Sequence, residues 1–176
     1  MDIFESAVDA VIGIEGRYSN DPLDPGGETM WGITVAVARA NGYASPMRDM
    51  PQSVARAIYR AVFWAPLRLD EVAEVAPGVA REVFDSNVNL YAGAAAKFLQ
   101  RSLLALTEAP IVVDGHLGPV TVQALRDYIT RRKAEGEIVL LRCLNGLQLA
   151  EYIRQVEATP TKERFRYGWV RGRVVI

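Results

Sequence analysis

The chain has 176 residues, of which 50% are hydrophobic and 23% charged, as is usual for one globular body or two small domains. Its formal net charge is −1, so its composition gives no basic surface that would favour nucleic acid as a partner. A single cysteine, Cys143, and a single histidine, His116, exclude an internal disulfide and a metal site of the His/Cys type. We therefore expect no metal and no cofactor.

The N-terminal segment and the apolar stretches predict where the protein is made. Residues 1–5 contain acidic side chains and no basic one, whereas a secretory signal begins with basic residues. The longest apolar stretches fall well short of a membrane span. We therefore expect synthesis in the cytoplasm and no association with a membrane.

The first predicted element is an amphipathic helix that ends at a carboxylate. Its apolar positions are Ile3, Phe4, Ala7, Val8, Val11, Ile12 and Ile14. This spacing puts them on one face of a helix over residues 3–15, and Glu15 continues that face in the last turn. Gly16 can take the positive φ that commonly ends a helix. Desolvation and the negative helix end should both raise the pKa of Glu15, as suits a general acid.

A turn-rich loop follows the helix. Residues 20–22 (Asn-Asp-Pro) and 24–27 (Asp-Pro-Gly-Gly) are turn formers that can fold the chain back, so that Asp21 or Asp24 faces Glu15. One carboxyl in an apolar setting and another in a polar loop are what glycosidic cleavage requires. Farther along, Thr29 offers a hydroxyl that can hold a water, and Trp31 offers a ring that can stack on a sugar.

The string EGRYSNDP at residues 15–22, with DPGGET at 24–29 and GIT at 32–34, resembles the signature of glycoside hydrolase family 108. Members of that family are N-acetylmuramidase-type lysozymes, many of them phage endolysins. The resemblance implies that Glu15 is the catalytic acid, and Tyr18 matches the family's motif as well. We expect Tyr18 and Trp31 to bind substrate. Arg17 stands where the family usually has a second glycine, which adds bulk and charge beside the acid.

A second likeness concerns the mechanism. Phage lysozymes of another family carry a Glu, an Asp nine residues later and then a Thr, and Glu15, Asp24 and Thr29 approximate that spacing. It implies that Asp24 and Thr29 position the attacking water, while Asp21 caps the turn. The choice between Asp21 and Asp24 as second carboxylate stays open, and so does the stereochemical outcome.

Further helices are predicted over residues 34–42, 51–64, 77–91, 94–104, 119–131 and 137–157. In the first of these, Thr34 is the expected N-cap and Gly42 the expected stop. In the second, Phe63 is expected in the core, whereas core and cleft roles both remain open for Tyr59 and Trp64.

Residues 84–89, Phe-Asp-Ser-Asn-Val-Asn, resemble the F-D-x-x-V-N element of the same family, which lines the substrate cleft. Asp85 and Asn89 are four residues apart and therefore share one helix face. The resemblance implies that Asn89 contacts the glycan and that Asp85 orients it. A solvent-facing polar stripe or a hydrogen bond between helices would explain the same spacing.

The D-G-x-x-G-P loop at residues 114–119, within a helical stretch from about 94 to 169, resembles the peptidoglycan-binding-like region of the family. We therefore expect a lysozyme-like catalytic region at residues 1–93 and a helical peptidoglycan-binding-like region at 94–176, packed into one body. The predicted fold class is mainly α: a lysozyme-like helical bundle with a loop-rich catalytic segment and little or no β.

These observations predict a peptidoglycan hydrolase, an N-acetylmuramidase that cleaves the β-1,4 bond between N-acetylmuramic acid and N-acetylglucosamine. The expected role is that of a phage endolysin in host lysis. Its partner would be the peptidoglycan glycan strand, reached after export or through a holin pore, and a monomer would diffuse best through the wall. The alternatives are a lytic transglycosylase and a wall-binding or secretion-accessory protein of the same fold.

Overall fold

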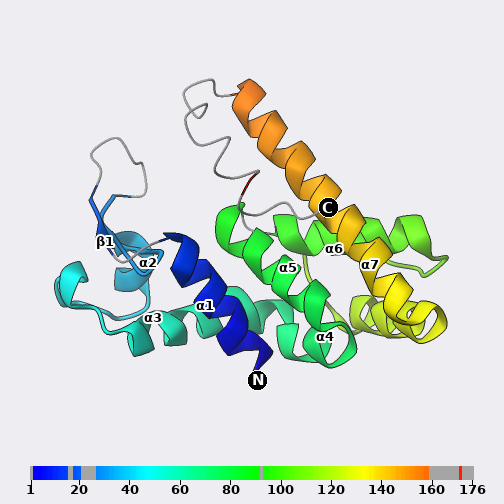
Figure 1. The fold of residues 1–176 in the computed structure, drawn as a ribbon, viewed down its shortest axis with the longest axis horizontal. Coiled ribbons are helices and arrows are strands. Elements are labelled where there is room, and N and C mark those ends of the chain that lie inside the picture. The colour runs from blue at the N-terminus through cyan, green and yellow to red at the C-terminus, as the bar shows by residue number, and fades with distance from the viewer. Residues whose placement is uncertain (1, 16–17, 21–26, 92, 159–170, 172–176) are drawn as a thin grey trace. The chain divides into compact units, whose positions relative to one another are not determined.

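The computed structural model describes residues 2–15, 18–20, 27–91, 93–158 and 171, and helices dominate these ranges (Figure 1). The chain forms two compact units, residues 1–66 and 67–176. Within the described residues the sheet is small, with three strands of two residues each. The predicted mainly α, lysozyme-like fold with little β is thereby confirmed. The predicted division between residues 93 and 94 stays a prediction.

The first unit contains α1 (Ile3–Glu15), β1 (Tyr18–Ser19), β2 (Thr29–Met30), β3 (Ile33–Thr34), α2 (Val35–Ala40), η1 (Met47–Asp49), α3 (Gln52–Ile58) and η2 (Tyr59–Trp64). The apolar stripe predicted for α1 is buried at Phe4, Ala7, Val8, Val11 and Ile12. The ring of Phe4 meets the ring of Trp64 edge to face, with centroids 5.3 Å apart. Burial of this stripe explains why these residues form a helix in the folded chain.

The two ends of α2 follow the predicted capping chemistry. The Thr34 hydroxyl oxygen accepts a hydrogen bond from the Val37 N–H at 3.4 Å, which occupies a donor that the first helical turn leaves unpaired. Beyond the other end, Gly42 has a φ of +83°, a conformation that a side chain would disfavour. The predicted start and stop of this helix are confirmed.

The single helix predicted over residues 51–64 changes character halfway. It is α-helical to Ile58 and π-helical from Tyr59 to Trp64. Tyr59 and Trp64 are fully buried, whereas Phe63 is only partly buried. The prediction that Phe63 belongs to the core is therefore wrong. A π-turn is wider than an α-turn, so a period of 3.6 residues does not identify its inward face.

The second unit contains α4 (Leu69–Val75), α5 (Pro77–Asn89), α6 (Ala94–Leu106) and α7 (Pro119–Ala158), and η3 (Ala65–Leu67) precedes it. Helix α5 packs against α4, α6 and α7 (Figure 1). The backbone of α7 is non-helical at Lys133, which divides it into two helical segments, close to the two helices predicted there. No described helix is long and apolar enough to span a bilayer.

The D-G-x-x-G-P loop is fastened to α6 by Gln100, whose side chain is buried. The Gln100 amide nitrogen donates to Asp114 Oδ1 at 2.7 Å, and its oxygen accepts from the Gly115 N–H at 3.0 Å. The first of these bonds, with help from the His116 N–H, lowers the pKa of the Asp114 carboxyl. Gly115 has a φ of +85°, so the loop also requires glycine there. Its sequence pattern therefore has a structural explanation.

Candidate functional site

Glu15 is the last residue of α1, as predicted. Its position puts the residue at the negative end of the helix dipole, where a carboxylate is less stable than elsewhere on the helix. The side chain of Glu15 lies outside the described residues, and so do Asp21 and Asp24. The structure therefore describes the helix that carries the predicted acid, and it describes neither predicted partner carboxylate.

The segment that follows Glu15 forms the small antiparallel sheet, in the order β1-β2-β3. Tyr18 pairs with Met30, and Thr29 pairs with both Ser19 and Thr34. Thr29 therefore lies on the middle strand of the sheet, and Tyr18 lies on the edge strand next to it. The sheet was not predicted, because strands of two residues are too short to show alternating hydrophobicity.

The Tyr18 side chain is held from two sides. Its hydroxyl donates to Glu28 Oε1 at 2.9 Å. The guanidinium of Arg48 lies 4.5 Å from the centre of its ring, in cation–π geometry. These contacts fix the ring, and sequence patterns alone did not identify Glu28 or Arg48 as its partners.

The Thr29 hydroxyl donates to the Gly27 carbonyl oxygen at 3.1 Å. This bond occupies the hydroxyl hydrogen and leaves the oxygen able to accept one. Such a hydroxyl can orient a water by accepting one of its hydrogens. The geometry is compatible with the role that the resemblance implies for Thr29.

Trp31 occupies a strained turn between β2 and β3. Trp31 and Gly32, the two residues between the paired Met30 and Ile33, have φ values of +54° and +77°, as a type I′ turn requires. Asparagine and glycine favour such positions, and a bulky side chain there costs about 1–2 kcal/mol. The indole N–H donates to the Met50 carbonyl oxygen at 2.8 Å. The Trp31 carbonyl oxygen accepts from the Tyr59 hydroxyl at 3.0 Å, so both ends of the residue are fixed.

Asp85 and Asn89 share one face of α5, as predicted, and are hydrogen-bonded. The Asn89 amide nitrogen donates to the Asp85 backbone oxygen at 2.7 Å and to Asp85 Oδ1 at 3.2 Å. A bond between helices is also present, because Gln148 of α7 donates to Asp85 Oδ2 at 3.1 Å. Sequence reasoning missed Gln148, whose contact joins residues far apart in the chain.

Another acidic residue, Glu82, lies one turn before Asp85 on α5. Burial raises the pKa of Glu82 to about 7, and the negative charge of Asp85 contributes to the same shift. Ser86 donates a weak hydrogen bond to Glu82 at 3.4 Å. The spacing of residues 82, 86 and 89 on one helix face could have pointed to this polar cluster.

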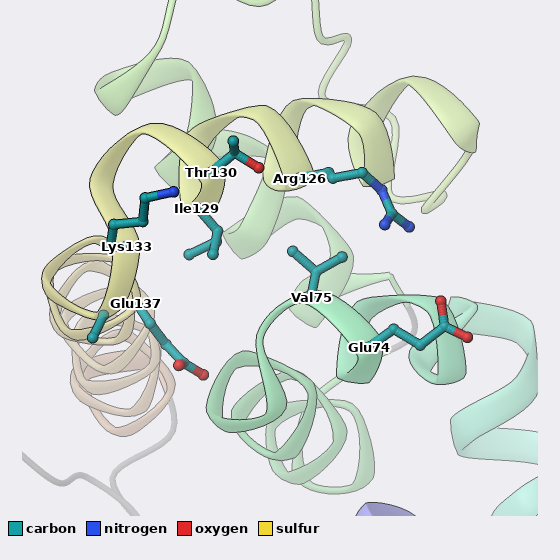
Figure 2. A pocket seen from close by; sticks show the side chains of 8 residues that line it. Glu74, Val75, Arg126, Ile129, Thr130, Lys133 and Glu137 are labelled. Carbon is teal, nitrogen blue, oxygen red and sulfur yellow. The ribbon is translucent and has the colours of Figure 1, made fainter.

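A surface hollow lies elsewhere in the second unit, between α4 and α7 (Figure 2). Its lining combines cationic side chains, Arg126 and Lys133, with the carboxylates of Glu74 and Glu137. Glu137 Oε1 accepts from the Gly78 N–H at 2.7 Å and so caps the N-terminus of α5. This contact gives Glu137 a structural role. No group of three or more potential metal-ligating side chains occurs in the described part of the chain.

Comparisons with known proteins agree with this description. Residues 8–90 match the family model of glycosyl hydrolase 108, and residues 94–174 match that of a predicted peptidoglycan domain. A solved structure titled "Structure of Brucella abortus SagA" is 26% identical to the chain, with a TM-score of 0.73, and the match covers 97% of this chain and 91% of that one. No curated protein matches. Most of the chain thus matches the glycosyl hydrolase 108 family followed by a peptidoglycan domain, and together these matches support a peptidoglycan hydrolase.

Proposed function

We propose that the protein is an N-acetylmuramidase that hydrolyses the β-1,4 bond between N-acetylmuramic acid and N-acetylglucosamine. The observation that carries the proposal is the position of Glu15 as the last residue of α1, directly before the sheet that bears Tyr18 and Thr29. Glu15 donates its proton to the glycosidic oxygen as the bond breaks. The oxygen of a water then bonds to the anomeric carbon, and the water gives up one proton to a carboxylate of the site, either ionised Glu15 or the second carboxylate, so that atoms and charge balance.

In this proposal Asp24 and Thr29 position the water, and Tyr18, Trp31, Asp85 and Asn89 hold the glycan. The accepting geometry of the Thr29 hydroxyl and the fixed ring of Tyr18 support these assignments. The role in host lysis as a phage endolysin, with release through a holin pore or another export route, belongs to the same proposal. It rests on the resemblance of residues 15–34 to lysozymes of that kind.

The masses of the released products test the reaction. Purified peptidoglycan treated with the full chain should release fragments that end in reducing N-acetylmuramic acid, as mass spectrometry can establish. A lytic transglycosylase would instead release anhydro ends, lighter by one water. Absence of any released fragment would contradict both reactions and favour a wall-binding or export role.

The strained turn gives a second prediction. Trp31→Asn places a residue that favours positive φ in the turn but removes the aromatic ring, so the hairpin should persist while the glycan loses its stacking surface. We expect the Michaelis constant for soluble glycan fragments to rise about tenfold. Trp31→Phe is the matched control, because it keeps a ring and loses only the bond to Met50. An unchanged Michaelis constant in folded Trp31→Asn would remove Trp31 from the glycan site.

A further inference from the structure

Gln148 lies between α7 and α5 with its side chain completely buried. Its amide nitrogen donates to Asp85 Oδ2 at 3.1 Å and to the Ser86 hydroxyl at 3.0 Å. A primary amide has two hydrogens, so both are engaged by neighbouring residues of α5. This arrangement fixes the carboxylate of Asp85 from the side of α7.

The other oxygen of the Asp85 carboxylate, Oδ1, accepts a hydrogen bond from the Asn89 side chain. Both hydrogens of the Asn89 amide are engaged within α5, one by the Asp85 backbone oxygen and the other by Asp85 Oδ1. Among the described residues, none donates a hydrogen bond to Asn89 Oδ1, and the side chain is partly exposed to solvent. The amide is therefore oriented with its carbonyl oxygen available as an acceptor.

We propose that Gln148 is a positioning residue for glycan recognition, acting through Asp85 on Asn89. The inference rests on the proposed function and extends it. Asn89 Oδ1 accepts a hydrogen bond from a donor on the glycan, a hydroxyl or an acetamido N–H. Since Gln148 lies in the region matched by the peptidoglycan domain, that region completes a binding group of the glycosyl hydrolase 108 region.

The physical basis is that the Asp85 carboxylate is contacted by both amides, with Oδ2 accepting from Gln148 and Oδ1 from Asn89. Gln148 occupies Oδ2 and thereby sets the plane in which Oδ1 meets Asn89. Loss of Gln148 removes the contact that α7 makes with Oδ2, and the Asn89 amide is then less well oriented towards the glycan. The Ser86 branch of the network leads instead to Glu82 and does not touch Asn89.

A double-mutant cycle on the full chain tests the proposal. Gln148→Leu, Asn89→Ala and the double variant are compared with wild type for the Michaelis constant on short soluble glycan fragments of peptidoglycan. Each single variant should raise that constant about tenfold, and the double variant should be no worse than Asn89→Ala. Ser86→Ala is the control, because it breaks another bond of the same glutamine. It should lower the melting temperature and leave the Michaelis constant within about twofold.

Three outcomes would overturn the proposal: an unchanged Michaelis constant in folded Gln148→Leu, additive effects in the double variant, or an equal rise in Ser86→Ala. If Gln148→Leu does not fold, the Asp85→Asn variant tests the proposal instead. The asparagine side chain has one acceptor oxygen, which can accept from Gln148 or from Asn89 but not from both. An unchanged Michaelis constant in Asp85→Asn would then overturn it.

A failure of the proposed hydrolase function can be distinguished from a failure of the positioning role of Gln148. If wild type releases no product, the dissociation constant for the same fragments replaces the Michaelis constant. A weaker affinity in Gln148→Leu than in wild type would still support the positioning role, and equal affinity or absence of binding by wild type would overturn it.

Discussion

Glu15→Gln should lower the rate of glycan cleavage by about a thousandfold while leaving the protein folded. Glutamine has nearly the same size but no proton to give to the leaving oxygen, so the bond must break without acid assistance. The measurement is the initial rate at which reducing ends appear from soluble peptidoglycan fragments, with the melting temperature taken in parallel.

Glu5→Gln is the matched control on the same helix. Glu5 is solvent-exposed on α1 and forms an ion pair with Arg56 at 2.5 Å. Loss of an exposed pair typically changes stability by about 1 kcal/mol or less, and we expect the cleavage rate to stay within about twofold of wild type. A Glu15→Gln protein that cleaves as fast as the Glu5→Gln protein would remove Glu15 from the chemistry.

The helical part of this fold could be predicted because it depends on local chemistry. The apolar residues of α1 repeat at helical spacing, which identified the helix, and that helix ends at Glu15. Thr34 and Gly42 bound α2 through interactions within a few residues of each other. The pairing of Asp85 with Asn89 likewise follows from a spacing of four residues on one helix.

The remaining features depend on residues that are distant in the chain or on unusual backbone geometry. Trp31 occupies a turn position that asparagine or glycine usually takes, and it is fixed there by Met50 and Tyr59. The contact of Gln148 with Asp85 exists only after α7 packs on α5. No local pattern encodes such contacts, so the small sheet and the polar network required the structure.

Glu82 leads to the second large expected effect, a loss of stability as pH rises. Its pKa in the folded protein is about 7, against 4.5 for an ordinary glutamate side chain. Between these values the folded state holds a proton that the unfolded state has lost. The contribution of Glu82 to folding is therefore fully present below pH 4.5 and declines as pH rises through 7. A pKa shift of this size corresponds to about 3 kcal/mol of folding free energy, which is lost in full at pH values well above 7.

Glu82→Gln should remove this dependence, because glutamine stays neutral at every pH and fills nearly the same space. Near pH 8 the variant should be more stable than wild type by up to about 3 kcal/mol, and near pH 4.5 the difference should be small. Urea unfolding across this range measures both curves. Glu157→Gln is the control, since that side chain is exposed on α7 and its replacement should leave the pH slope unchanged. Parallel curves for wild type and Glu82→Gln would contradict the prediction, because burial against α7 would then carry no cost for the charged form of Glu82.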